Sequence, residues 1–344
     1  MSSIGDLLTG IKSNPLLLLT IIFICAVIFI NGWTDAPNAI ATCVTTKALS
    51  VKKAVLLSAA FNFLGVIIMM IINKSVVVTI QNIIKFDNKY SLLLLSSALI
   101  SIVLWSVAAW FFGIPTSESH ALIAGLSGAA IALGGIKAIN VSEWQKVIYG
   151  LIASVVMGFA FGYIICKINL LLFKNISKQK SDKFFNAAQI AGSSAMSFMH
   201  GAQDGQKFIG IFLLAIAFSG EEASEDAIVY IMPVCSVLIS LGTLIGGKKI
   251  IKSVGMDMVK PKKFQGFSAD TGAAICLFLL SLIGAPASTT HTKTTAVLGS
   301  AAAVDIKKIN FKVFKEIFLA WILTFPICGI LSFIITKIFI NYIC

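Results

Sequence analysis

Long apolar runs alternate with short polar gaps along the whole 344-residue chain. A run of about 20 apolar residues is long enough to cross a lipid bilayer as a helix. The apolar runs lie near residues 15–31, 53–72, 91–112, 144–173, 227–246, 267–283 and 313–340. The pattern predicts an all-α polytopic membrane protein with about 10 to 12 transmembrane segments, counting those that polar residues interrupt.

Two apolar segments are interrupted by polar stretches that resemble each other. Asn31–Asn38 reads Asn-Gly-Trp-Thr-Asp-Ala-Pro-Asn, and His200–Lys207 reads His-Gly-Ala-Gln-Asp-Gly-Gln-Lys. Irregular backbone at membrane depth is tolerated only where it is buried in protein or lines a water-filled cavity. We therefore expect a broken helix at each stretch.

A second pair of polar clusters is also matched. Gly113–His120 returns 171 residues later as Gly284–His291, and both precede a helix rich in Gly and Ala. Pro near the first helical position and Ser or Thr at the cap are typical of a helix start. The free N–H groups of such a start favour an anion. The hydroxyl candidates for an anion site are Thr116, Ser117, Ser119, Ser288, Thr289 and Thr290. A single Ser there would only cap its helix, but the matched pair favours a site built twice.

These duplicated motifs divide the chain into two membrane repeats, a first half (1–173) and a second half (184–344), joined by a short basic linker (174–183). Asp35 and Asp204 are 169 residues apart, close to the 171-residue spacing of the hydroxyl clusters. An odd number of crossings in each half makes the two repeats inverted. Internal duplication of this kind is common in transporters.

The distribution of charged residues predicts how the chain is oriented in the membrane. Only 12% of the residues are charged, against about 25% in soluble domains. All 27 basic residues are Lys, and 17 of them fall in four gaps. Those gaps are 47–53, 174–183, 247–263 and 305–315. The positive-inside rule then places these gaps in the cytoplasm, and it places both termini and the acidic turn 220–226 outside. The net charge of +12 is thus explained by lysines that set the topology of a plasma-membrane protein. We therefore expect no nucleic-acid partner.

Asp35 and Asp204 are the candidates for cation binding. A carboxylate at membrane depth costs about 2.5–3.5 kcal/mol on insertion scales, so it faces a partner or water. Glu118, inside the first hydroxyl cluster, is a further candidate for coupling, and Asp270 is another carboxylate near an apolar segment. The alternative is that these carboxylates only fix the position of a helix at the membrane boundary.

Asn38 and Lys207 each stand three residues after one of those aspartates, on the same helical face. Lys207 has four open roles: it binds the anion, pairs with Asp204, takes the place of a bound cation, or extends to the membrane interface. Lys293 either adds a positive charge to the second hydroxyl cluster or extends to the interface in the same way.

His120 and His291 end the two hydroxyl clusters. Histidine titrates near neutral pH, so both are candidates for proton coupling. The alternative is that they pack or form hydrogen bonds without titrating.

The paired motifs resemble those of the inorganic phosphate transporter family, also called the PiT or Pho4 family. The resemblance is carried by Asn31–Ala41, His200–Lys207, Gly266–Ala274, Pro286–His291 and Trp321–Pro326, in order and over nearly the whole chain. It implies a secondary transporter of inverted repeats that moves phosphate with Na⁺ or H⁺. It also implies that the aspartate and hydroxyl motifs converge on substrate and cations. The chain departs from the family pattern at Trp33, Thr34, Pro37, Gln203, Asp270 and Glu118.

The predicted function is therefore cation-coupled symport of inorganic phosphate by alternating access, without a cofactor and without catalysis. The expected substrate-binding residues are Asn38, Thr116, Ser117, Ser119, Lys207, Ser288, Thr289 and Thr290. The expected cation-binding residues are Asn31, Asp35, Asn62, Glu118, His200 and Asp204, with Asp35 and Asp204 as metal ligands if Na⁺ is the coupling ion. A homodimer is compatible with this prediction.

Three other functions stay open at this point. A symporter of another tetrahedral oxyanion, such as sulfate, would use the same groups. An anion channel or a sensor that does not transport would also need a charged site in the membrane. An intramembrane enzyme is disfavoured, since the seven Cys residues form no Cys-x-x-Cys pair and no zinc motif or Ser–Lys pair stands in a supporting context.

Overall fold

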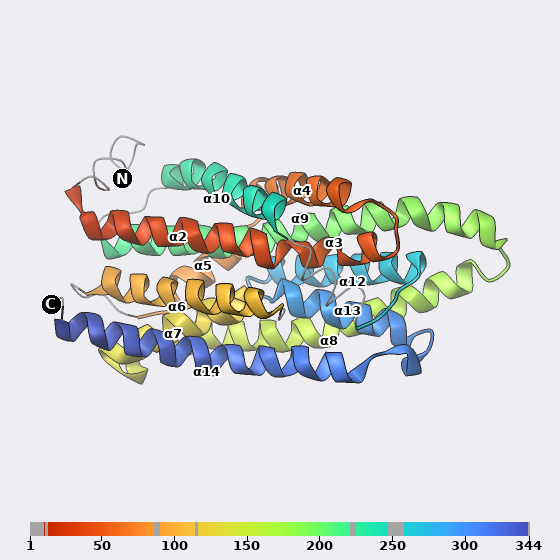
Figure 1. Cartoon of the computed structure of the whole chain (residues 1–344). Coiled ribbons are helices and arrows are strands. Elements are labelled where there is room, and N and C mark those ends of the chain that lie inside the picture. Colours follow the sequence, from red (N-terminus) through yellow and green to blue (C-terminus); the bar gives the residue numbers. More distant parts are fainter. Residues whose placement is uncertain are drawn as a thin grey trace.

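The protein is an elongated bundle of helices with both ends of the chain at one end of the bundle (Figure 1). The computed structural model describes residues 10, 13–85, 90–113, 116–220, 225–246 and 258–342. Seven helices within these residues are long and apolar enough to cross a membrane. The predicted all-α, polytopic membrane architecture is confirmed.

The described residues of the first half form seven α-helices and a short 3₁₀ helix. They are α2 (Pro15–Thr34), α3 (Ala36–Thr45), α4 (Val51–Ile72), α5 (Ser75–Gln81), α6 (Ser91–Phe112), α7 (Glu118–Gly134), η1 (Ile136–Ala138) and α8 (Val141–Leu172). The described elements of the second half are α9 (Lys178–Phe218), α10 (Glu225–Ile245), α12 (Lys263–Leu282), α13 (Thr289–Ala302), η3 (Ile306–Lys308) and α14 (Phe311–Tyr342).

The two halves repeat the same order of elements with opposite direction. The series α6, α7, η1, α8 corresponds to α12, α13, η3, α14, and the last helix has 32 residues in both. Gly113 and Gly284, at equivalent turns, have φ values of 70° and 69°, a conformation that favours glycine. Because α8 and α14 run in opposite directions along the bundle, as do α2 and α9 (Figure 1), the repeats are inverted.

The expected break occurs in the first half and not in the second. Helix α2 ends at Thr34 and α3 begins at Ala36. Helix α9, by contrast, continues for 41 residues through His200–Lys207, so the predicted break there is wrong. Pro37, which has no N–H to donate to the preceding turn, favours the break, although α10 and α14 continue through Pro233 and Pro326. The second stretch has glycines but no proline, and glycine lowers helix stability without removing a hydrogen bond.

Each short helix packs against the last helix of the other half, α7 on α14 and α13 on α8. Glycines allow these close approaches. A Cβ atom on Gly128 would overlap the backbone of Gly329, and one on Gly299 would overlap the backbone of Phe159. Small residues let membrane helices approach at backbone distance. The two halves are therefore interlocked around α7 and α13.

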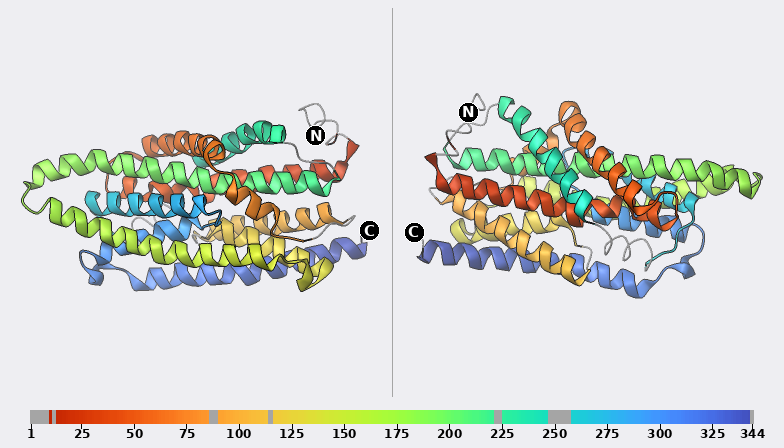
Figure 2. Two further views of the ribbon diagram at one scale, coloured as in Figure 1. Left: turned by 180° about the vertical axis from the view of Figure 1, so that it is seen from behind. Right: turned by 45° about the horizontal axis from the view of Figure 1, so that its top comes forward.

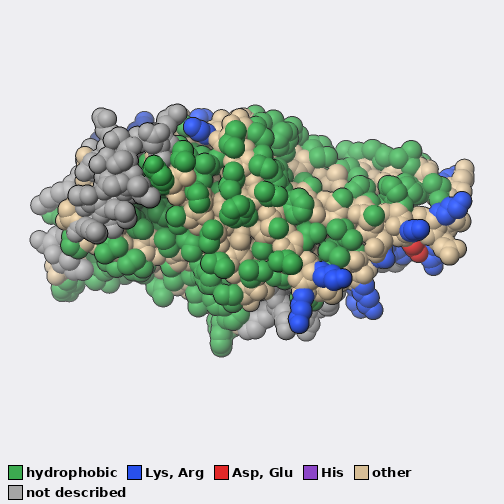
Figure 3. Space-filling model, turned by 90° about the horizontal axis from the view of Figure 1, so that it is seen from above, with side chains coloured by type: hydrophobic (Ala, Val, Ile, Leu, Met, Phe, Trp, Pro, Cys, Tyr) green, Lys and Arg blue, Asp and Glu red, His purple; other side chains and the backbone are tan. Residues whose placement is uncertain are grey.

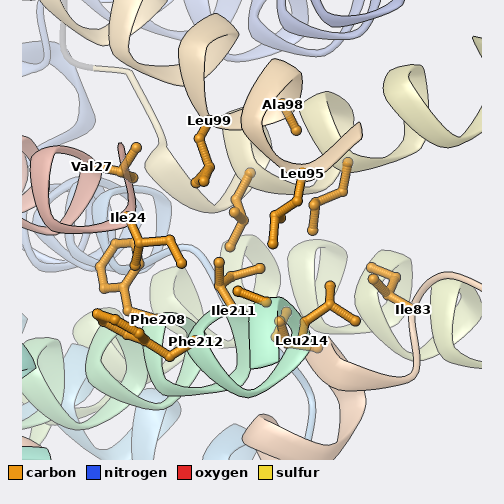
Figure 4. Close-up of a cluster of buried hydrophobic side chains, with 14 of the residues drawn as sticks. Ile24, Val27, Ile83, Leu95, Ala98, Leu99, Phe208, Ile211, Phe212 and Leu214 are labelled. Atoms are coloured by element: carbon orange, nitrogen blue, oxygen red, sulfur yellow. The ribbon is translucent and has the colours of Figure 1, made fainter. Parts of the chain in front are cut away.

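An apolar cluster fills the space between α2, α6 and the C-terminal part of α9. Ile24, Leu99, Phe208 and Ile211 belong to it, and Figure 4 shows these side chains pointing toward one another. All four are less than 5% exposed. The two halves differ at one position of this cluster. Leu99 is apolar, whereas the equivalent residue of the second half, 171 residues later, is Asp270.

The chain turns from α8 into α9 at residues 173–177, at the end of the bundle away from both termini (Figure 2). Residues 178–183 of the predicted linker already belong to α9. Most of the lysine side chains visible from above gather near that same end (Figure 3). This separation is the one that the lysine count predicts. Much of the basic gap 247–263 and part of the acidic turn 220–226 lie outside the described residues.

Candidate functional site

Helices α7 and α13 begin next to each other in the middle of the molecule. Ser117 caps α7 by accepting a hydrogen bond from the backbone N–H of His120 at 3.3 Å. Ser288 caps α13 in the same way, accepting from His291 at 3.2 Å. The two cap hydroxyls then contact each other at 2.8 Å. Two helix N-termini, one from each half, thus meet at a single point.

The neighbouring hydroxyls connect the two clusters to the polar stretches of α3 and α9. Ser119 donates from its Oγ to the carbonyl of Ala287 at 3.0 Å. Thr290 accepts a hydrogen bond from Asn38 Nδ2 at 3.1 Å. All six predicted hydroxyl residues are at most 5% exposed, namely Thr116, Ser117, Ser119, Ser288, Thr289 and Thr290. The structure therefore brings this set together and closes it off from solvent.

The Asp204 carboxylate is surrounded by hydrogen-bond donors. Its Oδ1 contacts Lys207 Nζ at 2.6 Å, and its Oδ2 accepts from Asn31 Nδ2 at 3.0 Å. His200 Nε2 lies 3.3 Å from the same Oδ2. Asn62 contacts the other ring nitrogen of His200 at 3.1 Å. Asn62 thus belongs to the network through His200 and not through the carboxylate.

The Asp35 carboxylate has a different environment. Its Oδ2 accepts a hydrogen bond from the backbone N–H of Glu118 at 3.4 Å, and Glu118 Oε1 accepts from Thr34 Oγ1 at 3.3 Å. No ion pair joins Asp35 or Glu118 to a basic side chain within the described part of the chain. Three buried oxygens nearby have no hydrogen-bond partner there, on Asn31, Asn38 and Glu118. Such hard oxygen donors suit an alkali cation or a proton.

Lys293 does not join the second hydroxyl cluster. Its ammonium group forms an ion pair with Asp270 and donates to Thr42 Oγ1 at 2.9 Å. Asp270 also accepts hydrogen bonds from Gln189 Nε2 at 2.6 Å and from Ser193 Oγ at 2.5 Å. Both charged side chains are 0% exposed. Lys293 and Asp270 therefore compensate each other in a separate network between α3, α9, α12 and α13.

We expect Lys293→Leu to lower the free energy of unfolding by about 3–5 kcal/mol, because it leaves the Asp270 charge buried without its partner. The double variant Asp270→Leu/Lys293→Leu should recover most of that loss. It reproduces Leu99 and Leu122, the equivalent residues of the first half. Thermal unfolding of the purified variants in detergent measures both effects. A double variant no more stable than the single one would contradict a compensating pair.

The two histidine rings lie beside the hydroxyl clusters and pack on each other. The ring centroids of His120 and His291 are 4.2 Å apart, and His291 stacks on Trp321 at 3.7 Å. Both histidines also line a cavity of about 530 Å³ between α8 and α14, together with apolar side chains such as Leu151 and Phe325. An apolar cavity of this kind does not suit a phosphate ion.

Several residues of these networks were missed in the sequence. Thr34 stands inside the first polar stretch but lacks an equivalent hydroxyl in the second. Gln189 and Ser193 lie four residues apart on one face of α9, ahead of its His200–Lys207 stretch. Polar residues at that spacing on a membrane helix indicate a polar partner inside the bundle.

The fold is that of an inverted-repeat membrane transporter, with a broken helix and two short helices meeting near its centre. The model of a family described as the phosphate transporter family matches this chain twice, over residues 31–181 and 172–332. The chain therefore belongs to the phosphate transporter family.

Individual relatives agree with this family assignment. A Bacillus subtilis protein described as "Probable low-affinity inorganic phosphate transporter" is 38% identical, over 94% of this chain and 99% of its own length. A Rhizobium meliloti protein with the same description is 34% identical, over 88% of this chain and 90% of its own. A solved structure described as "The sodium-dependent phosphate transporter" has a TM-score of 0.84 and covers 96% of this chain and 100% of its own. At 22% identity it shows that the fold is shared.

Proposed function

We propose that this protein carries inorganic phosphate across the plasma membrane together with a cation, Na⁺ or H⁺, by alternating access. The observation that carries the proposal is the 2.8 Å contact between the cap hydroxyls of Ser117 and Ser288. Each helix start adds free N–H groups and the positive end of its dipole. An anion placed between the two hydroxyls would receive donors from both halves at once.

Phosphate suits this site better than sulfate because the site also offers acceptors. Phosphate keeps at least one O–H group near neutral pH, which needs an acceptor when it is buried, whereas sulfate has none. The unpartnered oxygens of Asn38 and Glu118 are such acceptors. The descriptions of the two bacterial relatives as inorganic phosphate transporters support the same choice.

Coupling to a cation follows from the charge of the site. Asp35, Glu118 and Asp204 interact electrostatically with one another, and an anion bound beside them adds further negative charge. Moving one elementary charge against a membrane potential costs about 2.3 kcal/mol per 100 mV. A cation at Asp35 and Glu118 would offset both terms. The anion and the cation therefore bind well only together, which is the basis of symport.

In this proposal the residues fall into two groups around α7 and α13. The anion group consists of Asn38, Thr116, Ser117, Ser119, Ser288, Thr289 and Thr290. The cation group consists of Asn31, Asp35 and Glu118, while Asp204 with its neighbours His200 and Asn62 forms the second, symmetry-related position. Lys207 borders both groups, because it contacts Asp204 and the Ser119 hydroxyl.

The inverted repeats supply the motion. Helix α7 packs on α14, and α13 packs on α8, so each pair forms one unit. A tilt of one unit against the other would open the buried site first to one side of the membrane and then to the other. Equivalent elements run in opposite directions across the membrane. The outward-open and inward-open forms can therefore be built from similar contacts in which the two repeats exchange roles.

Uptake of labelled phosphate into proteoliposomes tests the proposal, with Na⁺ and pH gradients imposed separately. We expect phosphate to accumulate above its outside concentration when one of the two gradients is present. Arsenate should compete strongly and sulfate weakly. Uptake that only equilibrates phosphate would indicate a channel, and stronger competition by sulfate than by arsenate would indicate the other oxyanion.

A further inference from the structure

Lys207 occupies the position that Asn38 occupies in the first half, 169 residues earlier. The two side chains make equivalent contacts. Asn38 Nδ2 donates to Thr290 Oγ1 at 3.1 Å, and Lys207 Nζ donates to Ser119 Oγ at 2.6 Å. Thr290 and Ser119 are themselves equivalent, 171 residues apart. The two positions thus differ mainly in that only the second carries a positive charge.

The Lys207 ammonium group is held by three kinds of oxygen. A carboxylate oxygen of Asp204, the hydroxyl of Ser119 and the backbone carbonyl of Ala287 each lie 2.6 Å from Nζ. The Lys207 side chain is only 2% exposed. Carboxylate, hydroxyl and carbonyl oxygens are also the donors that bind hard metal cations. The ammonium group therefore sits in the kind of shell that would hold an alkali cation.

The first half contains the same set of groups without the ammonium. The equivalents of Asp204, Ser119 and Ala287 are Asp35, Thr290 and Thr116. The buried side-chain oxygens of Asn31, Asn38 and Glu118 have no hydrogen-bond partner within the described residues, as noted above. The shell of the second half is thus occupied by the Lys207 ammonium group, whereas the shell of the first half contains oxygens without a hydrogen-bond partner.

We infer that the Lys207 ammonium group is a tethered cation that permanently fills the second of two symmetry-related cation positions. Each transport cycle then takes up one exchangeable cation, at Asp35 and Glu118, where a symmetric site would take two. The inference rests on the proposed function and defines its coupling stoichiometry.

A tethered ammonium group also changes how much charge crosses the membrane in each transport cycle. A tethered ammonium balances Asp204 and attracts the anion as a bound cation would, but it returns with the empty protein. Each phosphate is therefore accompanied by one cation fewer than in a transporter with two exchangeable positions. The protein therefore moves fewer cations down their gradient for each phosphate, and the highest phosphate accumulation that it can reach is lower.

The number of Na⁺ ions bound by the purified protein tests the inference, measured as equilibrium binding of radioactive ²²Na⁺ in the presence of phosphate at fixed pH. We expect the wild type to bind at most one Na⁺ per chain. Lys207→Asn, which copies Asn38, should bind one Na⁺ more than the wild type. In proteoliposomes that variant should also move one more positive charge per labelled phosphate, measured as a shift in reversal potential. Lys146→Asn is the matched control, since it removes an exposed lysine paired with Glu143 and should not change the number bound.

Equal numbers of Na⁺ on the wild type and on Lys207→Asn would overturn the inference. Two Na⁺ ions on the wild type would overturn it without any variant, so the test holds even if Lys207→Asn does not fold. The binding count does not depend on transport. A wild-type protein that does not move phosphate would refute the proposed function, but its number of bound Na⁺ ions could still be measured. A number of bound Na⁺ ions that contradicts the inference would not affect the evidence for phosphate uptake.

Discussion

We expect Asp35→Asn to lower the initial rate of coupled phosphate uptake by about 100-fold while the protein stays folded in the membrane. The amide has the shape of the carboxylate, so it still accepts the hydrogen bond from the Glu118 backbone. It no longer supplies the charge that holds the coupling cation. A hydrogen bond or contact to a charged group contributes about 1.5–3 kcal/mol, and about 1.4 kcal/mol corresponds to a tenfold change. Uptake of labelled phosphate in proteoliposomes measures the loss.

Asp204→Asn should lower coupled uptake at least as much as Asp35→Asn does, with an additional effect on stability. It leaves the Lys207 ammonium buried without its carboxylate, and breaking a buried ion pair costs about 3–5 kcal/mol. Asp182→Asn, at an exposed position early in α9, serves as the control for both variants. A wild-type rate of coupled uptake in Asp35→Asn or in Asp204→Asn would refute the cation assignment.

Ser288→Ala should raise the phosphate concentration at half-maximal uptake by about tenfold to 100-fold. It removes one of the two hydroxyls that meet between the helix starts, and a hydrogen bond to a charged group contributes about 1.5–3 kcal/mol. Ser117→Ala should have a similar effect, because the two residues are equivalent. The concentration dependence of labelled phosphate uptake measures the change.

The serine also caps α13, and loss of a cap costs about 1 kcal/mol of helix stability. Ser288→Thr separates the two roles, since threonine keeps a hydroxyl in the same place and should retain most of the affinity. Ser154→Ala removes a buried hydroxyl that only donates to the carbonyl of Leu151 and should leave the affinity unchanged. An unaltered half-saturation concentration in Ser288→Ala would count against an anion between the helix starts.

Duplication made much of the fold predictable from the sequence. The hydroxyl clusters 171 residues apart indicated two helix starts, and the structure has a capping Ser117 and a capping Ser288. The length of the apolar runs indicated the membrane helices, because few structures other than a helix satisfy their backbone hydrogen bonds inside a bilayer. Inversion followed from an odd number of crossings and from the uneven distribution of lysine. Each of these features depends on a pattern repeated in the chain, which a single motif would not have established.

The continuity of α9 was not predictable with the same rules. Polar residues and glycines at membrane depth indicate a break, but only a residue such as Pro37 removes a backbone hydrogen bond. Asp204 and Lys207 sit on an intact helix because both side chains have partners. Lys207 donates to α7 and to the segment before α13, and Asp204 accepts from Asn31 on α2 and from Lys207. The partners that make this possible lie far away in the sequence.

Side-chain partners within the site were the least predictable part. Lys293 stands beside the second hydroxyl cluster in the sequence, and yet it points to Asp270 on α12. The direction of a side chain on a helix follows from packing, which the linear pattern does not contain. The absence of an equivalent pair at Leu99 and Leu122 is visible in the sequence, but it acquires meaning only once Asp270 and Lys293 are seen to touch.

Transport as proposed requires that the anion binds between the cap hydroxyls of α7 and α13. Crystals of the purified protein grown with arsenate test it most directly, because arsenic gives an anomalous scattering signal that marks the position of the anion. We expect one strong peak between Ser117 and Ser288, close to Thr290 and Asn38, with the two hydroxyls moved apart. A peak at any other place in the protein, or no peak at a saturating arsenate concentration, would contradict the account.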